Sequence, residues 1–441
     1  MASKIRPKER TAILNSLRAG VVPHVGQHHI QVGRVHEIKA LMEDIEQVGA
    51  GGAALRLVIG PYGSGKSFFL SLIQAIALER KLVATRADLN PDRRFHASGG
   101  QARSLYAELA RNIATRARPD GGALASVAER FISDSVGTAQ SQGMPPQQVI
   151  QERLHHLTEL VGGYDFAEVV GAYWKGHDSG NDQLKSDAVR WLRGEFGTKT
   201  DARNALGVRT IIDDGNSWDM LKLLARFSIL AGFSGLLVAF DELVNLYKLS
   251  STRARNSNYE QILRILNDCL QGSAEHLGIL MGGTPEFLQD PRRGLYSYEA
   301  LQSRLAENTF AGKGIVDYSG PVIRLANLSQ EDLFILLTKI HQVMVSPDPE
   351  RVLLPEEGIH SFLEHCSKRV GEAYFRTPRS SIKAFVDLLS VLDQNPGLDW
   401  RELIGTVEIA EEKNPDLEPL PAGAEPESES EPVDGLSTFT L

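Results

Sequence analysis

The chain carries the stretch Gly60-Pro-Tyr-Gly-Ser-Gly-Lys-Ser67, which matches the pattern G-x-x-x-x-G-K-[ST] at every position. Glycines in such a loop let backbone N–H groups approach phosphate oxygens without a Cβ in the way. Lys66 is placed to reach the β- and γ-phosphates of ATP, and the Ser67 hydroxyl is a ligand that suits Mg²⁺. The motif therefore predicts a site for ATP and Mg²⁺. The residues expected around the phosphates are Gly60, Pro61, Tyr62, Gly63, Ser64, Gly65, Lys66, Ser67 and Phe68.

The flanking residues favour this interpretation over a chance match in a glycine-rich chain. Leu55–Ile59 (LRLVI) is a short β-type run directly before the loop, and Ser67–Glu79 is an apolar helical pattern directly after it. A helix that begins there points its N-terminal dipole at the bound anion. Gly33 and Arg34, which precede an earlier helical pattern, are further candidates for contact with the nucleotide, near the base.

A second motif follows the continuous apolar run Leu236–Phe240, which ends in Asp241-Glu242. A strand of this type is buried on both faces in a parallel sheet. At its end Asp241 would hold Mg²⁺ through water, beside the Ser67 ligand, and Glu242 is suited to act as the general base on the attacking water. The adjacent glutamate favours ATP hydrolysis in the additional-strand class over a small-molecule kinase. The alternative is an ordinary acidic pair at a strand terminus.

Two polar residues are candidates for sensing the γ-phosphate. The strand-like run that ends at Gly282 leads into Thr284, which would contact the γ-phosphate or the lytic water unless it only forms a turn. Thr377 followed by Pro378 has the pattern of a helix N-cap and first turn, which places Arg379 at the start of a helix. Arginine is the usual residue for stabilising charge on a transferring phosphoryl group.

An arginine from a neighbouring subunit is a further possibility. Arg292, Arg293 and Arg304 all follow Thr284, and Arg304 is the preferred candidate. A solvated helix face is the alternative for each of them.

The order of the patterns predicts an α/β fold with a parallel sheet. Strand-like runs alternate with helical patterns, which is typical of parallel sheets flanked by helices. Together with the loop this indicates a P-loop NTPase of the additional-strand class, with a large helical insert and a C-terminal helical lid. The expected strands are Leu55–Ile59, Lys81–Leu89, Leu236–Phe240, His276–Gly282 and Pro321–Leu325.

We expect four parts along the chain. Residues 1–20 form a basic arm or helix, and 21–325 form the ATPase domain with the helical insert at about 102–217. Within the insert a loop is expected at Trp174–Asp182. Residues 326–409 form the helical lid, and 410–441 form an acidic disordered tail.

The formal net charge of −9 argues at first against a nucleic-acid partner. Most of it lies in Ala410–Leu441, which carries −8, whereas Met1–Gly20 carries +4. The basic arm is suited to phosphate backbones, although a solvated arm is the simpler interpretation. The total charge therefore neither supports nor excludes contact with DNA.

Other features point to a cytoplasmic protein. There are 2 cysteines, too few for a disulfide framework. No signal peptide is readable, and the most apolar run, Phe227–Phe240, is interrupted by Ser and Gly and shorter than the roughly 20 residues of a membrane span. The cluster His24, His28 and His29 lacks partners at metal-ligand spacing.

These landmarks together resemble an AAA+ ATPase of the origin-recognition branch. More narrowly, Ile13–Pro23 (ILNSLRAGVVP), Ile30–Arg34 (IQVGR), the phosphate loop and Leu295–Leu305 are similar to the BrxD-like ATP-binding proteins of BREX phage-defence systems. The resemblance implies a bacterial anti-phage role alongside other BREX proteins, possible contact with DNA, and possible homo-oligomers on nucleotide or DNA.

Two functions fit these observations. The first is a motor or switch that binds and hydrolyses ATP. The second is a slow, nucleotide-dependent scaffold or loader that recruits a partner to DNA without motor activity.

Overall fold

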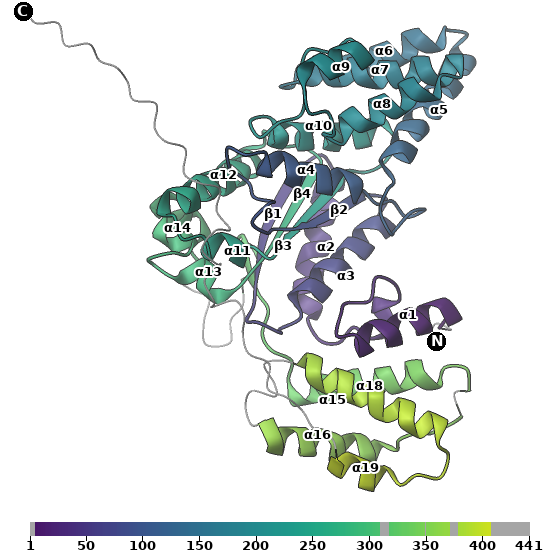
Figure 1. Ribbon diagram of the computed structural model, residues 1–441, viewed down its shortest axis with the longest axis vertical. Helices are drawn as coiled ribbons and strands as arrows, with labels where there is room; N and C mark the ends of the chain where they lie inside the picture. Colours follow the sequence, from purple (N-terminus) through teal and green to yellow (C-terminus); the bar gives the residue numbers. More distant parts are fainter. Residues whose placement is uncertain (1–4, 309–316, 349, 371–377, 407–441) are drawn as a thin grey trace, which may run out of the picture.

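The computed structural model describes residues 5–308, 317–348, 350–370 and 378–406, and its centre is a five-stranded parallel sheet (Figure 1). All five strands expected from the sequence are confirmed. They run in the order β2-β3-β4-β1-β5, so β4 lies between the strand before the phosphate loop and the strand that ends in Asp241. The strands are β1 (Ala53–Ile59), β2 (Val83–Asp88), β3 (Leu236–Asp241), β4 (Leu277–Gly283) and β5 (Val322–Arg324).

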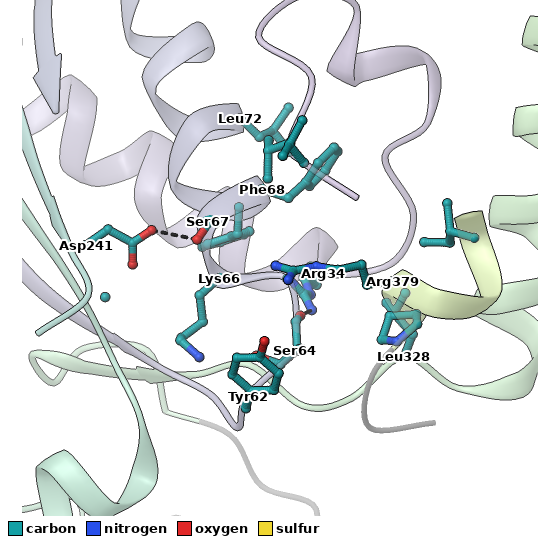
Figure 2. Close-up of a pocket in the computed structure, with 18 of the residues that line it drawn as sticks. Arg34, Tyr62, Ser64, Lys66, Ser67, Phe68, Leu72, Asp241, Leu328 and Arg379 are labelled. Carbon is teal, nitrogen blue, oxygen red and sulfur yellow. Dashed lines mark hydrogen bonds between the residues drawn. The ribbon is translucent and has the colours of Figure 1, made fainter. Parts of the chain in front are cut away.

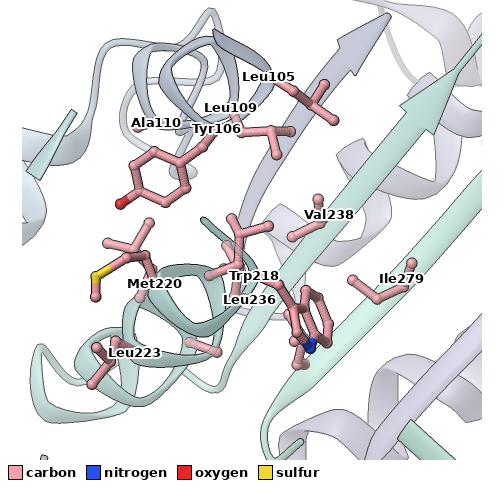
Figure 3. Packing of buried hydrophobic residues seen from close by; sticks show 14 of the residues in the cluster. Leu105, Tyr106, Leu109, Ala110, Trp218, Met220, Leu223, Leu236, Val238 and Ile279 are labelled. Carbon is pink, nitrogen blue, oxygen red and sulfur yellow. The ribbon is translucent and has the colours of Figure 1, made fainter. Parts of the chain in front are cut away.

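Helices cover both faces of the sheet because β-strand side chains alternate between faces. Leu237 and Ala239 of β3 face α2 (Val35–Gly49) and α3 (Lys66–Glu79). On the opposite face, Leu236 and Val238 pack with Ile279 of β4 against α4 and α10 (Figure 3). Every residue of β3 and β4 is buried, which accounts for their continuous apolar runs. Three helices contribute to the apolar core on this opposite face: α4 (Gln101–Arg111), α10 (Ser217–Leu230) and α12 (Thr252–Gln271).

The segment predicted as a helical insert is helical, but it has two parts. Its first helix, α4, lies directly on β2, whereas the following five helices form a group beyond α4 and α10 at the top of Figure 1. Trp191 and Phe166, whose ring centroids lie 6.4 Å apart, are buried in this group. The five helices are α5 (Leu124–Gln142), α6 (Pro146–His155), α7 (Gly163–Ser179), α8 (Asp182–Leu192) and α9 (Lys199–Leu206).

One local prediction in this region is wrong. The loop expected at Trp174–Asp182 does not begin at Trp174, because α7 continues to Ser179. Tyr173 and Trp174 are both buried, so the apolar face of α7 extends further than the polar and glycine residues around it suggested. The helix ends where Gly180 adopts a φ of 69°, a conformation that favours glycine.

Short helices follow β3 and β4 at the carboxyl end of the sheet. The chain returns from them to the edge strand β5, whose partner is β1. They are α11 (Val244–Tyr247), α13 (Pro285–Gln289), the 3₁₀ turn η2 (Leu295–Ser297) and α14 (Glu299–Leu305).

The described residues after β5 are helical, as predicted, and they share a core with the N-terminal helix (Figure 1). Ile13 and Leu14 of α1 (Pro7–Arg18) are buried in that core. Arg10 donates hydrogen bonds from Nε and Nη2 to the Met344 carbonyl at 3.0 and 2.7 Å. The helices are α15 (Gln330–Val345), α16 (Glu356–Val370), α18 (Pro378–Gln394) and α19 (Trp400–Thr406).

The packing of α1 bears on the predicted basic arm. Arg18 lies 3.6 Å from a carboxylate oxygen of Asp387 and donates to the Ser390 hydroxyl at 2.6 Å. Arg10 and Arg18 therefore have partners within the chain. The loop that follows α1 contains the 3₁₀ turn η1 (Gln27–His29) and leads to α2. No helix among the described residues is long and apolar enough to cross a membrane.

Candidate nucleotide-binding site

The glycine-rich loop joins the end of β1 to the start of α3. Gly63 and Gly65 have φ angles of 76° and 79°, which L-residues with a side chain rarely adopt. A Cβ on Gly60 would lie 2.5 Å from the Ser64 Oγ, so the tight approach at the start of the loop also requires glycine. These constraints produce the open backbone turn that the sequence motif predicts at this position.

Positive groups converge inside the loop. Lys66 donates from Nζ to the carbonyls of Gly60 and Pro61, at 2.8 and 3.0 Å. Lys66 is also the first residue of α3, where the backbone N–H groups of the first turn have no partner within the helix. The buried Ser64 Oγ has no hydrogen-bond partner among the described residues. An ammonium group, helix N–H groups and an unpaired hydroxyl together fit a bound phosphate chain.

The acidic pair at the end of β3 lies against the first turn of α3. Ser67 donates its hydroxyl to Oδ2 of Asp241 at 2.6 Å, although 174 positions separate them (Figure 2). Asp241 is 2% exposed, and its Oδ1 accepts the Glu242 N–H at 2.9 Å. A hydroxyl and a carboxylate oxygen at this distance are the hard ligands that Mg²⁺ prefers. Among the described residues no group of three or more His, Cys, Asp or Glu side chains is placed to hold a metal ion.

The backbone of Glu242 is unusual. Its φ of 59° lies in the left-handed region, which is uncommon for residues other than glycine. Conformations of this kind cluster at functional sites because the surrounding structure has to hold them in place. Glu242 lines the same cavity as Lys66 and Ser67.

A cavity of about 220 Å³ extends from the loop to the C-terminal helices (Figure 2). Its polar end holds the loop and the acidic pair, and its other walls are largely apolar. These walls come from the segment after α1, from α3, and from the helices after β5. The apolar residues include Val21, Val22, Ile30, Val32, Phe68, Leu72, Leu328, Leu336 and Ile382. Apolar walls beside a phosphate cradle are suited to a nucleotide base.

Arg34 and Arg379 both line the cavity. Arg34 donates from Nη2 to the Ser64 carbonyl, and its guanidinium lies over the Phe69 ring, 5.8 Å from the centroid. Burial lowers the pKa of Arg34, against the opposing effects of Glu37 and Asp332. Arg379, in the first turn of α18, lies beside Gly20 at the mouth of the cavity.

Thr284 also lines the cavity, where β4 ends. It is 2% exposed and caps α13, because its Oγ1 accepts the Phe287 N–H at 3.3 Å. A hydroxyl that accepts one hydrogen bond can still donate its own proton. Its position therefore suits both the predicted sensing role and the turn that was the alternative.

The remaining predicted residues lie outside the cavity lining. Arg304 is on α14, where it donates to Oδ1 of Asn267 at 2.8 Å and to the Ala300 carbonyl at 2.9 Å. Gly33 has a φ of 61° and packs near Asp332 of α15. Gly60 and Pro61 contribute through their carbonyls to Lys66. The predicted N-cap Thr377 lies outside the described residues.

Two parts of the site were not predicted from the sequence. One is the apolar wall from the segment after α1, and the sequence feature that could have indicated it is the apolar run Val21-Val22-Pro23. The other is Arg86 on β2, which donates to Asp241 Oδ2 at 2.7 Å and to the Ser67 carbonyl at 3.1 Å. Its signal was an arginine inside a β-type run, but the partner of that arginine could not be identified from sequence alone.

Substitution of Gly282 by Ala is expected to damage the site. A Cβ there would lie 2.6 Å from Asp241 Oδ1 and 2.9 Å from Leu70 Cδ1, so the carboxylate has to move. Overpacking of this kind costs about 1–3 kcal/mol of unfolding free energy. Urea unfolding and the Mg²⁺ dependence of ATP binding measure the two effects.

The matched control is Gly137→Ala. Gly137 is exposed within α5, and a Cβ there meets nothing within 4 Å. We expect it to stabilise the protein by about 0.5–1 kcal/mol, because alanine favours helix over glycine. Equal stability and equal ATP binding in the Gly282→Ala protein and the wild type would contradict the close approach at Asp241.

The parallel sheet, the glycine-rich loop and the paired oxygen ligands are consistent with the P-loop class of nucleotide-binding proteins. The chain belongs to the family of the BREX system ATP-binding proteins BrxC/D, whose family model matches residues 5–408. This match confirms the resemblance inferred from the sequence and supports a role in ATP binding within BREX defence. No curated protein matches the chain.

Proposed function

We propose that this protein is a Mg²⁺-dependent ATPase of the AAA+, additional-strand class that acts as a motor or switch in BREX defence. The observation that carries the proposal is the 2.6 Å contact between Ser67 and Asp241 in a cavity that Lys66 and Glu242 also line. A site for nucleotide binding alone does not need the adjacent glutamate, whereas hydrolysis needs a group that accepts a proton from water.

The sheet order supports the additional-strand class. β4 pairs with β1 on one side and with β3 on the other, so a strand separates the phosphate loop from the acidic pair. The strand also brings Thr284 to the cavity between these two elements, since the carboxyl ends of parallel strands meet at one edge of the sheet.

Each residue then has a defined role. Lys66 and the first-turn N–H groups of α3 bind the β- and γ-phosphates, and Ser67 and Asp241 hold Mg²⁺. Bound Mg²⁺ neutralises charge on the transferring phosphoryl group. Glu242 accepts the proton of the water whose oxygen bonds to the γ-phosphorus as the β–γ bridging bond breaks, releasing ADP and phosphate. Thr284 and Arg379 contact the γ-phosphate side of the cavity.

We propose that residues 326–409, which contain the helices after β5, act as a lid on the nucleotide site. Arg379 is on α18, and α18 packs on α1 and α15 in one core. A nucleotide that contacts Arg379, Val21 and Ile30 would therefore touch two segments of the same core. Binding or loss of the γ-phosphate would be transmitted to the lid and α1 together.

Partners are also part of the proposal. Family membership supports action with other BREX proteins in the cytoplasm, and DNA is a further candidate. In a homo-oligomer, exposed Arg304 is our candidate for contact with the γ-phosphate of a neighbouring subunit.

The experiment is a measurement of phosphate release and of molecular mass, with and without ATP and duplex DNA. We expect Mg²⁺-dependent phosphate release that DNA or BREX partners stimulate, together with a mass increase on ATP binding. A slow, DNA-insensitive rate in a monomer would favour the scaffold or loader instead. Phosphate transfer to an acceptor other than water would contradict the ATPase assignment.

A further inference from the structure

Arg86 places a positive charge at the position where the metal ligands meet. Its Nη2 lies 2.7 Å from Asp241 Oδ2, and the same oxygen accepts the Ser67 hydroxyl at 2.6 Å. Its Nη1 donates to the Ser67 carbonyl at 3.1 Å. The guanidinium thus bridges the two residues that we propose as Mg²⁺ ligands.

The contact of Arg86 with Asp241 compensates the negative charge of a buried carboxylate. The Asp241 carboxylate is 2% exposed, and a buried carboxylate is costly unless a cation or several hydrogen-bond donors compensate it. The Arg86 side chain is itself 24% exposed, so part of it remains in contact with solvent.

A divalent cation and the guanidinium compete for the Asp241 carboxylate. Ser67 and Asp241 present their oxygens to one metal position, and two cations beside the same carboxylate oxygen repel each other. The approach of Mg²⁺ to Asp241 and Ser67 therefore favours a shift of Arg86 away from Oδ2.

A second carboxylate, that of Asp88, lies next to Arg86. The Arg86 Nη2 is 3.4 Å from Asp88 Oδ1, and the Asp88 side chain is 57% exposed. Asp88 is the register partner of Asp241 across the β2–β3 pair. The Arg86 main chain is held by its place in β2 and by Asn112, which donates to the Arg86 carbonyl at 2.9 Å. The side chain can therefore change partners without a shift of the strand.

We propose that Arg86 is a positioning residue that occupies Asp241 in place of the metal and transfers to Asp88 when Mg²⁺ binds with the nucleotide. The inference rests on the proposed Mg²⁺–ATP site. It means that metal binding carries an energetic cost set by Arg86, and that Asp88 lowers this cost. The strength of the coupling between Mg²⁺ and the nucleotide then depends on Asp241, Arg86 and Asp88. Once Mg²⁺ is bound, Arg86 and Asp88 contact neither the metal nor the nucleotide.

The test measures the affinity of the full chain for ATPγS, a slowly hydrolysed ATP analogue, in EDTA and in excess Mg²⁺. The ratio of the dissociation constant in EDTA to that in Mg²⁺ reports the metal–nucleotide coupling and requires no turnover. We expect Arg86→Met to raise this ratio about tenfold, because Mg²⁺ no longer competes with a guanidinium. Arg86→Lys keeps the charge and should stay within about threefold of wild type.

Asp88→Asn supplies a test that leaves the buried carboxylate and Arg86 intact. It removes the alternative partner, so the ratio should fall about threefold, as expected for a partly exposed ion pair. The control is Arg80→Met, because Arg80 lies 3.3 Å from Glu46 at the other end of α3 and should leave the ratio unchanged. If Arg86→Met does not fold, the Asp88→Asn result decides.

The outcomes separate the two proposals. A ratio that is unchanged or lower in Arg86→Met, or unchanged in Asp88→Asn, would overturn the role of Arg86 while leaving the Mg²⁺–ATP site in place. Failure of the wild-type protein to bind ATPγS with or without Mg²⁺ would overturn the proposed function and this inference together.

Discussion

Glu242→Gln is expected to bind ATP with nearly wild-type affinity and to hydrolyse it at least about 100-fold more slowly, the range typical for loss of a general base. Glutamine has almost the same shape as glutamate, so the cavity and the N–H···Oδ1 contact from residue 242 to Asp241 should persist. The amide, however, does not take up a proton from water. Single-turnover phosphate release, with ATP affinity measured separately, distinguishes loss of chemistry from loss of binding.

The control for this experiment is Glu286→Gln. Glu286 lies in the first turn of α13, close in sequence to Thr284, but is not part of the cavity lining. It should retain wild-type turnover. A wild-type rate in Glu242→Gln would show that another group accepts the proton and would remove the main argument for the hydrolytic class.

Lys66→Ala is expected to weaken ATP binding by a factor on the order of 100, equivalent to about 3 kcal/mol. The ammonium group donates to two loop carbonyls and lies where the phosphates would bind, so its loss removes a charge-assisted contact with them. Nucleotide titration followed by fluorescence measures this change, and hydrolysis at low ATP should fall with it.

Lys39→Ala is the matched control for the lysine substitution. Lys39 is 76% exposed and lies 4.0 Å from Glu43 on α2, outside the cavity. It should bind ATP like the wild type. If Lys66→Ala bound ATP within about threefold of the wild type, the loop would not be the phosphate site.

Much of the central fold was predictable because its signals are local. Each expected strand overlaps an observed one, as in Lys81–Leu89 and β2 (Val83–Asp88). Short apolar runs bounded by glycine or charged residues favour strands that are buried on both faces. The end of α7 was missed for the opposite reason, since burial of Trp174 depends on packing between helices, which the local pattern does not contain.

The N-terminal helix shows what a charge count does not contain. Five basic residues in Met1–Gly20 suggested an arm for a phosphate backbone. In the structure Arg10 and Arg18 bond to residues of α15 and α18, more than 300 positions away. Composition records the charges but not their partners, and the partners decide whether a charge is available to another molecule.

The loop Gly60–Ser67 and its strand–helix setting followed from the sequence alone, because backbone conformation there depends on glycines a few residues apart. The two motifs predicted that Ser67 and Asp241 serve one metal site, but the sheet order, the direct hydrogen bond between these two side chains and the guanidinium of Arg86 beside them came only from the tertiary structure. The bonds from Ser67 and from Arg86 to Asp241 join residues 174 and 155 positions apart. Pairing over such separations is set by how strands and helices pack together, and neighbouring residues carry no record of it.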